Sequence, residues 1–347
     1  MKIAVDIKAQ LTESKFRGAG YYTKNLFEAL ENYDRDNSYA RWDSSKKLTK
    51  NFDLLIIPYF FPFNISLPIR KKIKTIVVIH DLIPLKFPDK FPAGLRGSLI
   101  WQLQRYLLKK VDAIITDSHV SQNDIINIVK VSSDKVFVVY PTVSTKFVPL
   151  TNNSHLKKIK DKYGLTDEFI LYVGDCNWNK NIPSLIRACQ KLNINLVLVG
   201  KVFTERRIDL NHPWNKSLKE VNKLTKNNKL VKKTGFVEED DLMAIYNLAS
   251  LYVQPSYYEG FGLSMVEAMK CGCPVLSSEG GSLKEIGGQD LLYFDPDNVD
   301  ELTNKIKQVY FNPNLKKRLR TAGFLRAKQY AALNLVNNLK NVYRQII

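Results

Sequence analysis

Short runs of consecutive apolar residues recur along the first half of the chain and alternate with longer amphipathic segments. A continuous apolar run of this kind is typical of a parallel strand that is buried on both faces. The segment 21–32 instead carries its apolar residues at helical spacing, behind a turn at 18–20. Strands that alternate with helices favour right-handed βαβ units and a parallel sheet. The predicted strands are 3–7, 54–57, 75–79, 113–116 and 136–139.

The second half of the chain repeats this alternation. Between the halves, residues 141–153 include two prolines and many small polar residues, which predicts a linker between two α/β domains. The tail from Lys316 is predicted to be helical and basic. The predicted strands are 169–173, 196–199, 251–253 and 274–276, and the predicted helices are 182–192, 239–249, 264–270 and 299–311.

The length and composition of the chain suit two domains of ordinary size, with 347 residues and a hydrophobic content of 45%. No apolar run approaches the roughly 18–20 residues that a membrane span needs. Residues 1–7 are apolar but are interrupted by Asp6, so they predict a strand and not a signal peptide. We therefore expect a cytoplasmic protein.

The four cysteines do not suggest a metal site or a disulfide framework. Cys271 and Cys273 are too close in sequence for an easy disulfide, and Cys176 and Cys189 are isolated. No pair of C-x2-C motifs with zinc-site spacing is present. We expect buried or idle thiols.

The net charge of +18 is spread evenly along the chain. Residues 1–148 contain 23 basic and 14 acidic residues, and residues 149–347 contain 29 and 20, so each half carries about +9. An even spread argues against one dedicated nucleic-acid face, and we expect no nucleic-acid partner. It is consistent with anionic substrates and with attraction to an anionic membrane leaflet. Solvated lysines are the alternative explanation.

Two carboxylates eight residues apart, Glu259 and Glu267, flank a glycine-rich turn and the start of a helix. Gly260 and Gly262 let the turn approach a ligand closely. The free N–H groups at the N-terminus of the helix form an anion site that needs no metal. Carboxylates on either side accept hydrogen bonds from sugar or ribose hydroxyls. An anion beside two polyols is what a nucleotide sugar offers, whereas the alternative is two structural glutamates.

Three more polar loops follow predicted strands. His80 can hydrogen-bond a sugar hydroxyl or stabilise charge near an anomeric carbon, or it can simply cap the next turn. Lys180 can neutralise a diphosphate, or it can be a solvated lysine. Gly18 and Gly20 either let a substrate approach the backbone or form an ordinary helix-entry turn. Because ligands of such sheets bind beyond the C-terminal ends of the strands, we expect these loops to converge on one interdomain cleft.

Four segments, in order along the chain, resemble motifs of the retaining glycosyltransferases of family 4. The block from Glu259 to Glu267 is similar to that family's E-x7-E motif, and His80-Asp81-Leu82 resembles its catalytic loop. The resemblance spans about Gly18 to about Pro296. It implies an α/β fold of GT-B architecture, with two Rossmann-like doubly wound domains that face an interdomain cleft. The four segments are 80–82, 172–181, 234–246 and 255–275.

The resemblance also implies a role for each matching residue. Glu267 would bind the ribose hydroxyls, and Glu259 would contact the donor sugar near the reaction centre. Lys180 would stabilise the charge on the leaving nucleotide, and His80 would act in the catalytic loop. No metal and no other cofactor is expected, because a helix dipole and a lysine take the place of a metal. The other expected donor-binding residues are Phe261, Gly262, Leu263, Gly174, Asn179, Phe236, Gly18 and Gly20.

Three parts of the chain follow from the same resemblance. Residues 1–148 would form an N-terminal Rossmann-like domain that binds the acceptor. Residues 149–324 would form a C-terminal Rossmann-like domain that binds the nucleotide sugar. Residues 325–347 would form a helix that crosses back to the first domain.

The sequence departs from the family pattern at Asp175. Many members carry an Arg directly after the glycine that corresponds to Gly174, where it contacts the phosphates. An acid beside a diphosphate is unfavourable unless it turns away, although Asn177 or Asn179 could donate hydrogen bonds instead. This departure concerns donor affinity more than reaction class. The segment Asp295-Pro296-Asp297 looks like a metal-binding DxD motif, but it matches the family's turn before its C-terminal helices, so we expect no metal there.

The expected function is therefore retaining transfer of a sugar from a nucleotide-diphosphate donor to a glycan or lipid-linked acceptor. Mannose is the preferred donor sugar, with rhamnose, glucose and galactose as competitors. The alternatives are a catalytically weak GT-B binding subunit that partners an active transferase, and a sugar phosphorylase or epimerase-like hydrolase. Asp175 is the one feature that favours the binding subunit.

A segment of the first half combines apolar and basic residues in a way that suits a membrane surface. Residues 94–110 predict an amphipathic helix with Trp101, several leucines and four basic residues, and 70–74 is a basic run. Peripheral contact with an anionic membrane at the inner face of the cell is the functional interpretation. Packing of the same apolar residues in the core is the alternative.

Overall fold

The computed structural model describes residues 1–12, 18–45, 48 and 51–346. The chain divides into two compact units, each with its own six-stranded parallel sheet. Unit 1 comprises Met1–Val143 and Tyr330–Ile347, and unit 2 comprises Ser144–Gln329.

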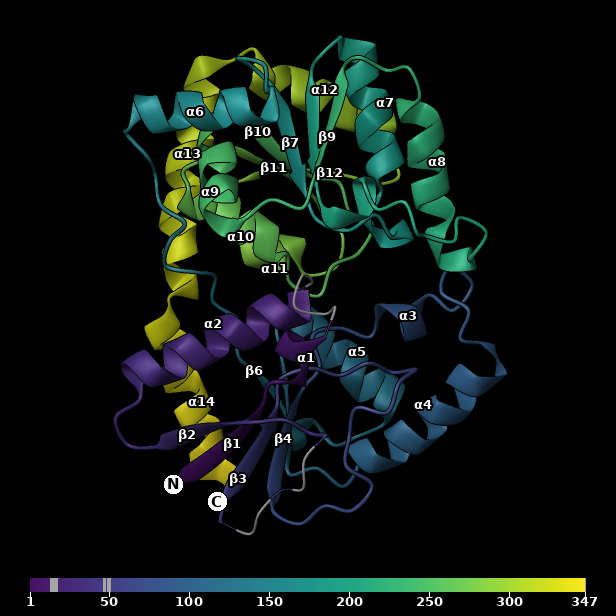
Figure 1. Ribbon diagram of the computed structural model, residues 1–347, viewed down its shortest axis with the longest axis vertical. Coiled ribbons are helices and arrows are strands. Elements are labelled where there is room, and N and C mark those ends of the chain that lie inside the picture. The colour runs from purple at the N-terminus through teal and green to yellow at the C-terminus, as the bar shows by residue number, and fades with distance from the viewer. Residues whose placement is uncertain (13–17, 46–47, 49–50, 347) are drawn as a thin grey trace. The chain divides into compact units, whose positions relative to one another are not determined.

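The sheet of unit 1 has the order β2-β1-β3-β4-β5-β6 (Figure 1). Every pairing is parallel, as the alternation of strands and helices in the sequence predicts. Side chains of a strand point alternately to its two faces, and here both faces are buried. The strands are β1 (Lys2–Asp6), β2 (Ser38–Trp42), β3 (Leu54–Ile57), β4 (Lys74–Val78), β5 (Ala113–Thr116) and β6 (Val136–Val138).

Helices cover both faces of this sheet, because its strands contribute to two separate apolar clusters. Val5 and Ile56 pack in one cluster with residues of α2 and α14, whereas Ala4 and Leu55 pack in the other with residues of α4 and α5. The last helix of the chain therefore belongs to the core of unit 1, where it packs beside α2. The helices are α1 (Lys8–Leu11), α2 (Gly18–Tyr33), α3 (Ile83–Lys86), α4 (Gly94–Leu108), α5 (His119–Val129) and α14 (Ala332–Ile346).

The sheet of unit 2 has the order β9-β8-β7-β10-β11-β12, which is the doubly wound order of dinucleotide-binding folds. The chain starts at β7 in the middle, moves outward to β9, and then returns to build the other half from β10. The strands are β7 (Ile170–Val173), β8 (Leu196–Val199), β9 (Val231–Gly235), β10 (Leu251–Gln254), β11 (Val275–Ser278) and β12 (Leu292–Phe294).

Helices follow most strands of unit 2, as right-handed crossovers require. Short 3-10 turns, among them Trp178–Lys180, connect some of them. The helices are α6 (Asn153–Tyr163), α7 (Ile182–Leu192), α8 (Lys216–Thr225), α9 (Glu239–Leu248), α10 (Leu263–Lys270), α11 (Leu283–Gly287), α12 (Val299–Tyr310) and α13 (Pro313–Ala327).

The α/β prediction is confirmed, and each strand that was not predicted lies at a sheet edge. These strands are β2, β9 and β12. An edge strand pairs on one side and is partly solvated, so it does not need the continuous apolar run by which a central strand is recognised. The segment of β9, Val-Lys-Lys-Thr-Gly, illustrates this.

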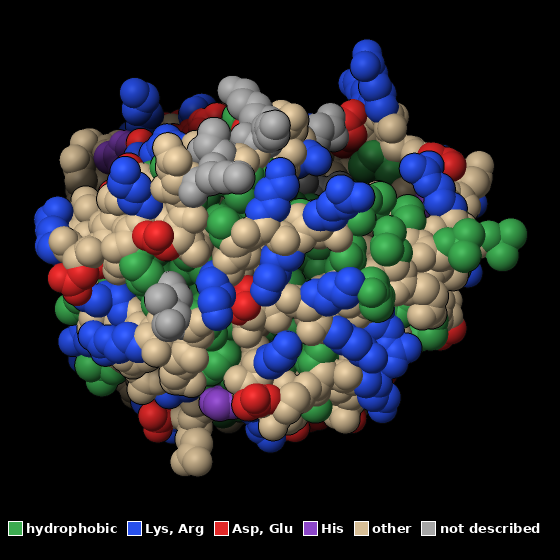
Figure 2. Space-filling view, turned by 90° about the horizontal axis from the view of Figure 1, so that it is seen from below, with side chains coloured by type: hydrophobic (Ala, Val, Ile, Leu, Met, Phe, Trp, Pro, Cys, Tyr) green, Lys and Arg blue, Asp and Glu red, His purple; other side chains and the backbone are tan. Residues whose placement is uncertain are grey.

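Basic side chains are prominent on the surface of the described residues (Figure 2). Lys and Arg side chains are spread across the face that Figure 2 shows. Among the described residues, no helix has the length and apolar character to cross a membrane. The four cysteines are buried free thiols. Within the same residues, no cluster of His, Cys, Asp and Glu side chains could hold a metal ion.

Candidate active site

The strand order of unit 2 reverses between β7 and β10, and the residues with the strongest sequence signals follow these two strands. At such a switch point, the connections after the two strands leave in opposite directions and open a crevice for a ligand. Gly174 and Lys180 follow β7, and Glu259 follows β10. The fold therefore brings together two motifs that lie far apart in the sequence.

Lys180 and Glu259 form a bidentate ion pair at this switch point. Lys180 Nζ donates to both carboxylate oxygens of Glu259, at 2.8 Å each. Glu259 is only 5% exposed, whereas the Lys180 side chain is 23% exposed. A carboxylate this deep needs a charged partner, because an unpaired charge in the interior is strongly destabilising. The lysine is the member of the pair that faces solvent, where an anion can reach it.

A buried polar network beneath the pair fixes the Glu259 carboxylate. Oε1 accepts hydrogen bonds from Gln254 Nε2 at 2.9 Å and from Ser256 Oγ at 2.6 Å, besides the bond from Lys180. Tyr252 in turn donates to the Gln254 side chain. Among the described residues, Oε2 accepts from Lys180 alone. Oε2 thus has acceptor capacity left for a ligand hydroxyl, whereas Oε1 is fully used.

The main chain around Glu259 is held by a second glycine-rich turn. Ser282 donates from both its N–H and its Oγ to the Glu259 carbonyl, at 3.0 and 3.1 Å. Gly281 has φ +64°, and a Cβ there would lie 2.4 Å from the same carbonyl oxygen. Only glycine fits this close approach without displacing the backbone of the motif.

Gly262 turns the chain from the Glu259 loop into α10. Its φ of 102° lies in the region that favours glycine, and its carbonyl accepts from Met265 N at 3.0 Å. The first N–H groups of a helix have no partner within the helix, so the N–H groups of Gly262 and Leu263 are available to an anion. Phe261 is buried and anchors the turn in the apolar core. The anion site that the sequence places at this turn stays a prediction.

Glu267 lies one turn into α10 and is partly buried. Tyr246 donates to its Oε2 at 2.8 Å. Burial raises the pKa of Glu267 to about 7, although the Tyr246 hydrogen bond opposes the shift. Burial, followed by the charges of Glu259 and Glu267, raises the pKa of Tyr252 well above its usual range, so both glutamates lie near this tyrosine. Glu267 is therefore a carboxyl group that titrates near neutral pH beside the ion pair.

Asn179 holds the loop of Lys180 against the loop of Glu259. Its Nδ2 donates to the Tyr258 carbonyl at 3.0 Å, and its own carbonyl accepts from Tyr257 N at 2.8 Å. The side chain is buried, so its place is in the scaffold beneath Lys180. Phe236, which directly follows β9, is 37% exposed.

Asp175 lies at the position where the resemblance places an arginine, and two of its oxygens accept hydrogen bonds from neighbouring residues. Oδ1 accepts from Cys176 N at 3.2 Å, and the carbonyl accepts from Tyr172 OH at 2.8 Å. Gly174, just before it, has φ 147° and packs closely on Gly200, where a Cβ would lie 2.2 Å from the Gly174 carbonyl oxygen. The loop therefore has a tightly packed backbone, with a carboxylate at position 175.

The predicted residues of unit 1 lie at the same kind of strand end. His80 follows β4, and its Nδ1 lies 2.8 Å from Asp117 Oδ2, which follows β5. Burial lowers the pKa of His80, but the charge and hydrogen bond of Asp117 outweigh burial, so that the pKa is raised overall. Gly18 and Gly20 belong to the first turn of α2 itself, which begins three residues earlier than the predicted helix.

Three residues that the sequence analysis did not single out belong to these sites. Gln254 ends β10, Asp117 directly follows β5, and Tyr22 contacts the His80 ring edge-on with ring centroids 4.5 Å apart. Asp117 carried a usable signal, because a carboxylate directly after a predicted buried strand meets the same criterion that selected His80. Gln254 carried a similar signal, because it directly follows the predicted strand 251–253, whereas Tyr22 carried none, since it lies inside the predicted helix 21–32.

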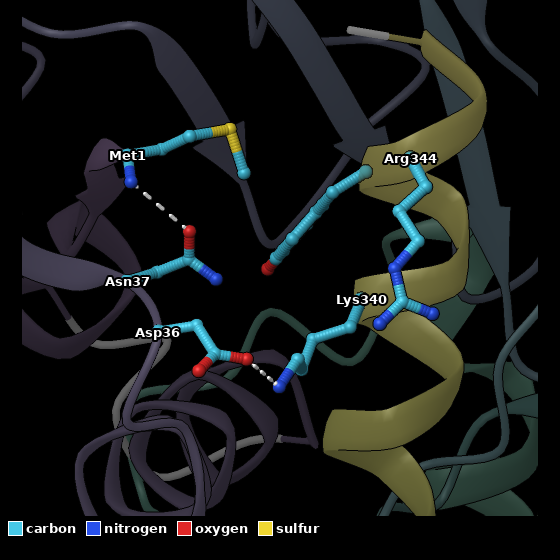
Figure 3. Close-up of a pocket in the computed structure, with 6 residues that line it drawn as sticks. Met1, Asp36, Asn37, Lys340 and Arg344 are labelled. Atoms are coloured by element: carbon cyan, nitrogen blue, oxygen red, sulfur yellow. Dashed lines mark hydrogen bonds and ion pairs between the residues drawn. The ribbon is translucent and has the colours of Figure 1, made fainter.

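A pocket in unit 1 lies away from these strand ends. Met1, Asp36, Asn37, Lys340, Tyr343 and Arg344 line it, and Figure 3 shows the Lys340 amine directed at the Asp36 carboxylate. Met1 immediately precedes β1, so the pocket lies at the N-terminal edge of the sheet. Ligands of doubly wound sheets bind at the opposite edge, and we do not assign this pocket to the active site.

Two family models cover most of the chain. Residues 156–326 match the model described as glycosyl transferases group 1, and residues 16–147 match the model described as glycosyltransferase family 4. The first match contains Lys180, Glu259 and Glu267, and the second contains His80.

Several similar curated proteins are mannosyltransferases by name. The chain is 30% identical over 272 residues to the serotype-specific mannosyltransferase WbdA of Escherichia coli, covering 75% of this chain and 32% of that protein. The chain thus spans about a third of the length of this relative. It is 28% identical over 291 residues to the O-antigen chain mannosyltransferase B of Escherichia coli, covering 81% of this chain and 72% of that one.

Solved structures share the fold over nearly the whole chain. Sucrose-phosphate synthase from Thermosynechococcus elongatus superposes with a TM-score of 0.76 at 17% identity, covering 99% of this chain and 98% of that chain. Anabaena Alr3699/HepE in complex with UDP-glucose gives a TM-score of 0.73 at 17% identity, with 99% of both chains covered.

Proposed function

We infer the function from the family, because the chain belongs to the group 1 glycosyltransferases of glycosyltransferase family 4. Its two Rossmann-like units are those of the GT-B fold. We propose that the chain transfers a sugar from a nucleotide-diphosphate donor to a glycan or lipid-linked acceptor and retains the anomeric configuration. The observation that carries this proposal is the Lys180–Glu259 pair at the switch point of unit 2, beside the N-terminus of α10.

The proposed mechanism assigns the developing negative charge to unit 2. When the glycosidic bond breaks, the leaving diphosphate gains charge, which Lys180 and the N–H groups of Gly262 and Leu263 stabilise more in the transition state than in the ground state. In this proposal, Glu267 accepts hydrogen bonds from the ribose hydroxyls, and Glu259 Oε2 accepts one from the donor sugar. The leaving phosphate takes the acceptor proton on the front face, which retains the configuration. We propose that the reaction needs no metal, because these groups supply the positive charge.

We propose mannose as the donor sugar and a surface polysaccharide as the product class. The support is the names of two Escherichia coli relatives, a serotype-specific mannosyltransferase and an O-antigen chain mannosyltransferase. Rhamnose, glucose and galactose donors remain competitors.

A panel of nucleotides tests the proposed donor site. The melting temperature is measured without added metal in the presence of UDP, GDP, dTDP, ADP or CDP, and of the common sugar conjugates of each. We expect the nucleotides of one base to raise the melting temperature and the others to leave it unchanged. Turnover of the sugar conjugates of that base, followed by release of the nucleoside diphosphate, then identifies the sugar. If no nucleotide shifts the melting temperature and no conjugate is turned over, the proposed function is wrong.

Asp175 favours a second candidate, a binding subunit with little activity of its own. A carboxylate where the family places an arginine repels a diphosphate, unless its bond to Cys176 N keeps it turned away. An Asp175→Arg variant separates the two candidates. A binding subunit should gain donor affinity without turnover in the variant, whereas an active transferase turns over the donor before and after the change.

We propose peripheral contact with an anionic membrane through α4 of unit 1. Leu95 and Leu99 are 89% and 74% exposed on this helix, and Leu103 and Tyr106 are exposed beside them. Leu107 and Leu108 of the same helix are buried and pack in the core. The apolar residues of α4 are therefore of two kinds: some pack in the core, and the others are exposed and could contact a membrane. Exposed apolar residues that lie together on one helix, unlike scattered ones, are typical of an interaction surface.

The surroundings of this helix add apolar residues and positive charge. Gln104 donates from its Nε2 to the carbonyls of Phe61 and Asn64, which fastens the loop of exposed Ile65 onto α4. Basic and hydrophobic side chains stand together on the face in Figure 2. Such a mixture suits an anionic leaflet, where leucines enter the interface and basic side chains meet the headgroups. The basic residues nearest in sequence are Arg96, Arg105, Lys109 and Lys110 within 94–110, and Arg70, Lys71, Lys72 and Lys74 in the preceding run.

Flotation with vesicles tests this contact. The chain should float with phosphatidylglycerol vesicles at low salt and not with phosphatidylcholine vesicles. A Leu95→Ser/Leu99→Ser double variant should lose at least about tenfold in bound fraction, because each buried leucine side chain contributes roughly 1.5–3 kcal/mol. The matched control is Leu325→Ser/Leu333→Ser, which removes two exposed leucines elsewhere. Equal flotation of wild type and the α4 variant would contradict the proposal.

A further inference from the structure

Asp117 is a buried carboxylate whose charge partner is a histidine. It is 4% exposed, and its Oδ2 lies 2.8 Å from His80 Nδ1. Among the described residues, its Oδ1 has no hydrogen-bond partner, and no lysine or arginine pairs with it. A buried carboxylate without a cation is strongly destabilising. Electrostatics therefore favours the imidazolium form of His80, which neutralises Asp117.

The two residues are set in place by the ends of adjacent strands. β4 and β5 pair in parallel, with Val78 opposite Ile115. Beyond them, Thr116 Oγ1 donates to the Ile79 carbonyl at 2.7 Å, and Ser121 Oγ donates to the His80 carbonyl at 3.1 Å. Two side-chain bonds thus tie the backbone of the His80 loop to the segment that carries Asp117, and the pair is held before any ligand arrives.

The His80 ring is oriented so that one N–H is left. Nδ1 is engaged by Asp117, and Tyr22 of α2 packs edge-on against the ring at an interplanar angle of 70°. Nε2 is buried and has no hydrogen bond of good geometry within the described part of the chain, although the Pro58 carbonyl lies close enough to favour the charged ring. The side chain nevertheless keeps 22% of its surface exposed. A ring in this setting has a single N–H to offer, and its charge state decides how strong that donor is.

The groups around the ring favour its charged form on balance. Burial opposes the imidazolium, while Asp117, then Asp81 and the Pro58 carbonyl, stabilise it. Tyr22, the neighbour from α2, stays neutral, because burial and the Asp117 charge raise its pKa well above the usual range. No cation among the described residues pairs with Asp117 and competes with His80.

We propose that Asp117 is the positioning residue that keeps His80 as an imidazolium, with Nε2–H as a charged hydrogen-bond donor to a substrate oxygen. This inference rests on the proposed transferase function for its consequence in catalysis, but its structural part stands without it. Asp117 touches no substrate in this proposal; it acts through His80. Unit 1 then contributes a fixed positive charge, so that a neutral histidine at the same place would be a poorer catalyst.

Histidine NMR on the whole chain tests the structural part. In wild type, the His80 ring, assigned by its loss in a His80→Gln variant, should titrate above the ordinary value of about 6.5. Asp117→Asn keeps the size of the side chain and removes its charge, and should lower the titration midpoint by about one pH unit or more. Asp124→Asn is the matched control: it removes a charge from nearby α5, where Asp124 pairs with Lys86 instead, and should leave the midpoint unchanged. An unchanged midpoint in Asp117→Asn would overturn the proposal.

Turnover tests the consequence. Asp117→Asn should lower kcat about tenfold or more while KM changes little, and the alkaline limb of its pH profile should move to lower pH together with the NMR midpoint. Asp117→Glu, which restores the charge, should recover part of the loss, whereas a merely structural defect would not respond to charge. A shifted midpoint with an unchanged pH profile would overturn the positioning role. A wild-type chain without any turnover would refute the transferase function, and the NMR arm would still decide the pairing.

Discussion

Replacing Lys180 by Met is expected to lower turnover about a hundred- to a thousandfold, the loss typical for removing one preorganised group that stabilises transition-state charge. Lys180 is the cation at the switch point of unit 2, where a diphosphate can reach it. The measurement is the release of GDP from GDP-mannose, or of the corresponding nucleoside diphosphate if the nucleotide panel selects another donor. Turnover within a few-fold of wild type would contradict the role assigned to Lys180.

The same substitution strands a buried charge, so a loss of activity needs a control for folding. Without Lys180, the Glu259 carboxylate keeps only neutral donors, and the free energy of unfolding should fall by about 3 kcal/mol or more. A Lys180→Met/Glu259→Gln double variant removes both charges and should regain most of the melting temperature without regaining turnover. If the double variant regained turnover, the single variant would have failed through misfolding.

The affinities for GDP and for guanosine show whether Lys180 contacts the diphosphate or another part of the nucleotide. Guanosine carries no phosphate, so its affinity should hardly change in the double variant, while the affinity for GDP should fall. Equal losses for both ligands would mean that Lys180 supports the base and ribose instead of the diphosphate.

Glu267→Gln is expected to weaken GDP binding about tenfold to a hundredfold at pH 8 and much less at pH 6, as the loss of charge-assisted hydrogen bonds to the ribose predicts. The pKa of the Glu267 carboxyl is raised to about 7 by burial, so the acceptor form of wild type is populated only as the pH rises through that value. Calorimetric titration of wild type should therefore show affinity that increases from pH 6 to pH 8. Equal affinity of wild type and Glu267→Gln at both pH 6 and pH 8 would refute the ribose role.

The stability of the free protein should change in the opposite direction. Because folding raises the pKa of Glu267 above that of the unfolded chain, the native state binds more protons between about pH 4.5 and 7, and the free energy of unfolding falls as the pH rises through this window. Glu267→Gln removes this cost and should melt higher than wild type at pH 8. Tyr246→Phe is the control, because it deletes the hydrogen bond that lowers the pKa of Glu267 and should move the binding midpoint to higher pH.

The sequence was sufficient to predict the parts of the fold that burial encodes locally. The central strands carry continuous apolar runs because both of their faces are covered, and such runs are visible without any knowledge of neighbours. The edge strands β2, β9 and β12 were missed, since pairing on one side leaves them free to be polar. The motif from Glu259 to Glu267 was visible for a similar reason: glycines and a helix start are determined within a few residues.

Contacts within the candidate site could not be predicted in the same way. The sequence proposed Lys180 and Glu259 as separate ligand contacts, but they bond each other across 79 residues of chain. His80 was proposed alone, whereas Asp117, 37 residues away, is its partner. Both pairs depend on which strands are neighbours, and a propensity or a local pattern carries no information about strand order.

The sequence by itself determined the α/β class, the central strands, the glycine turns and the residues that follow the strands, because each of these is decided by steric and hydrophobic preferences over a few neighbouring residues. The tertiary structure alone decided that Glu259 is buried and neutralised by Lys180, that Glu267 titrates near neutrality, and that Asp117 meets His80. These properties arise from burial and from charges that distant segments bring within a few ångströms. Electrostatic energies in the interior are set by that distance and by the exclusion of water, and both exist only once the sheets have formed.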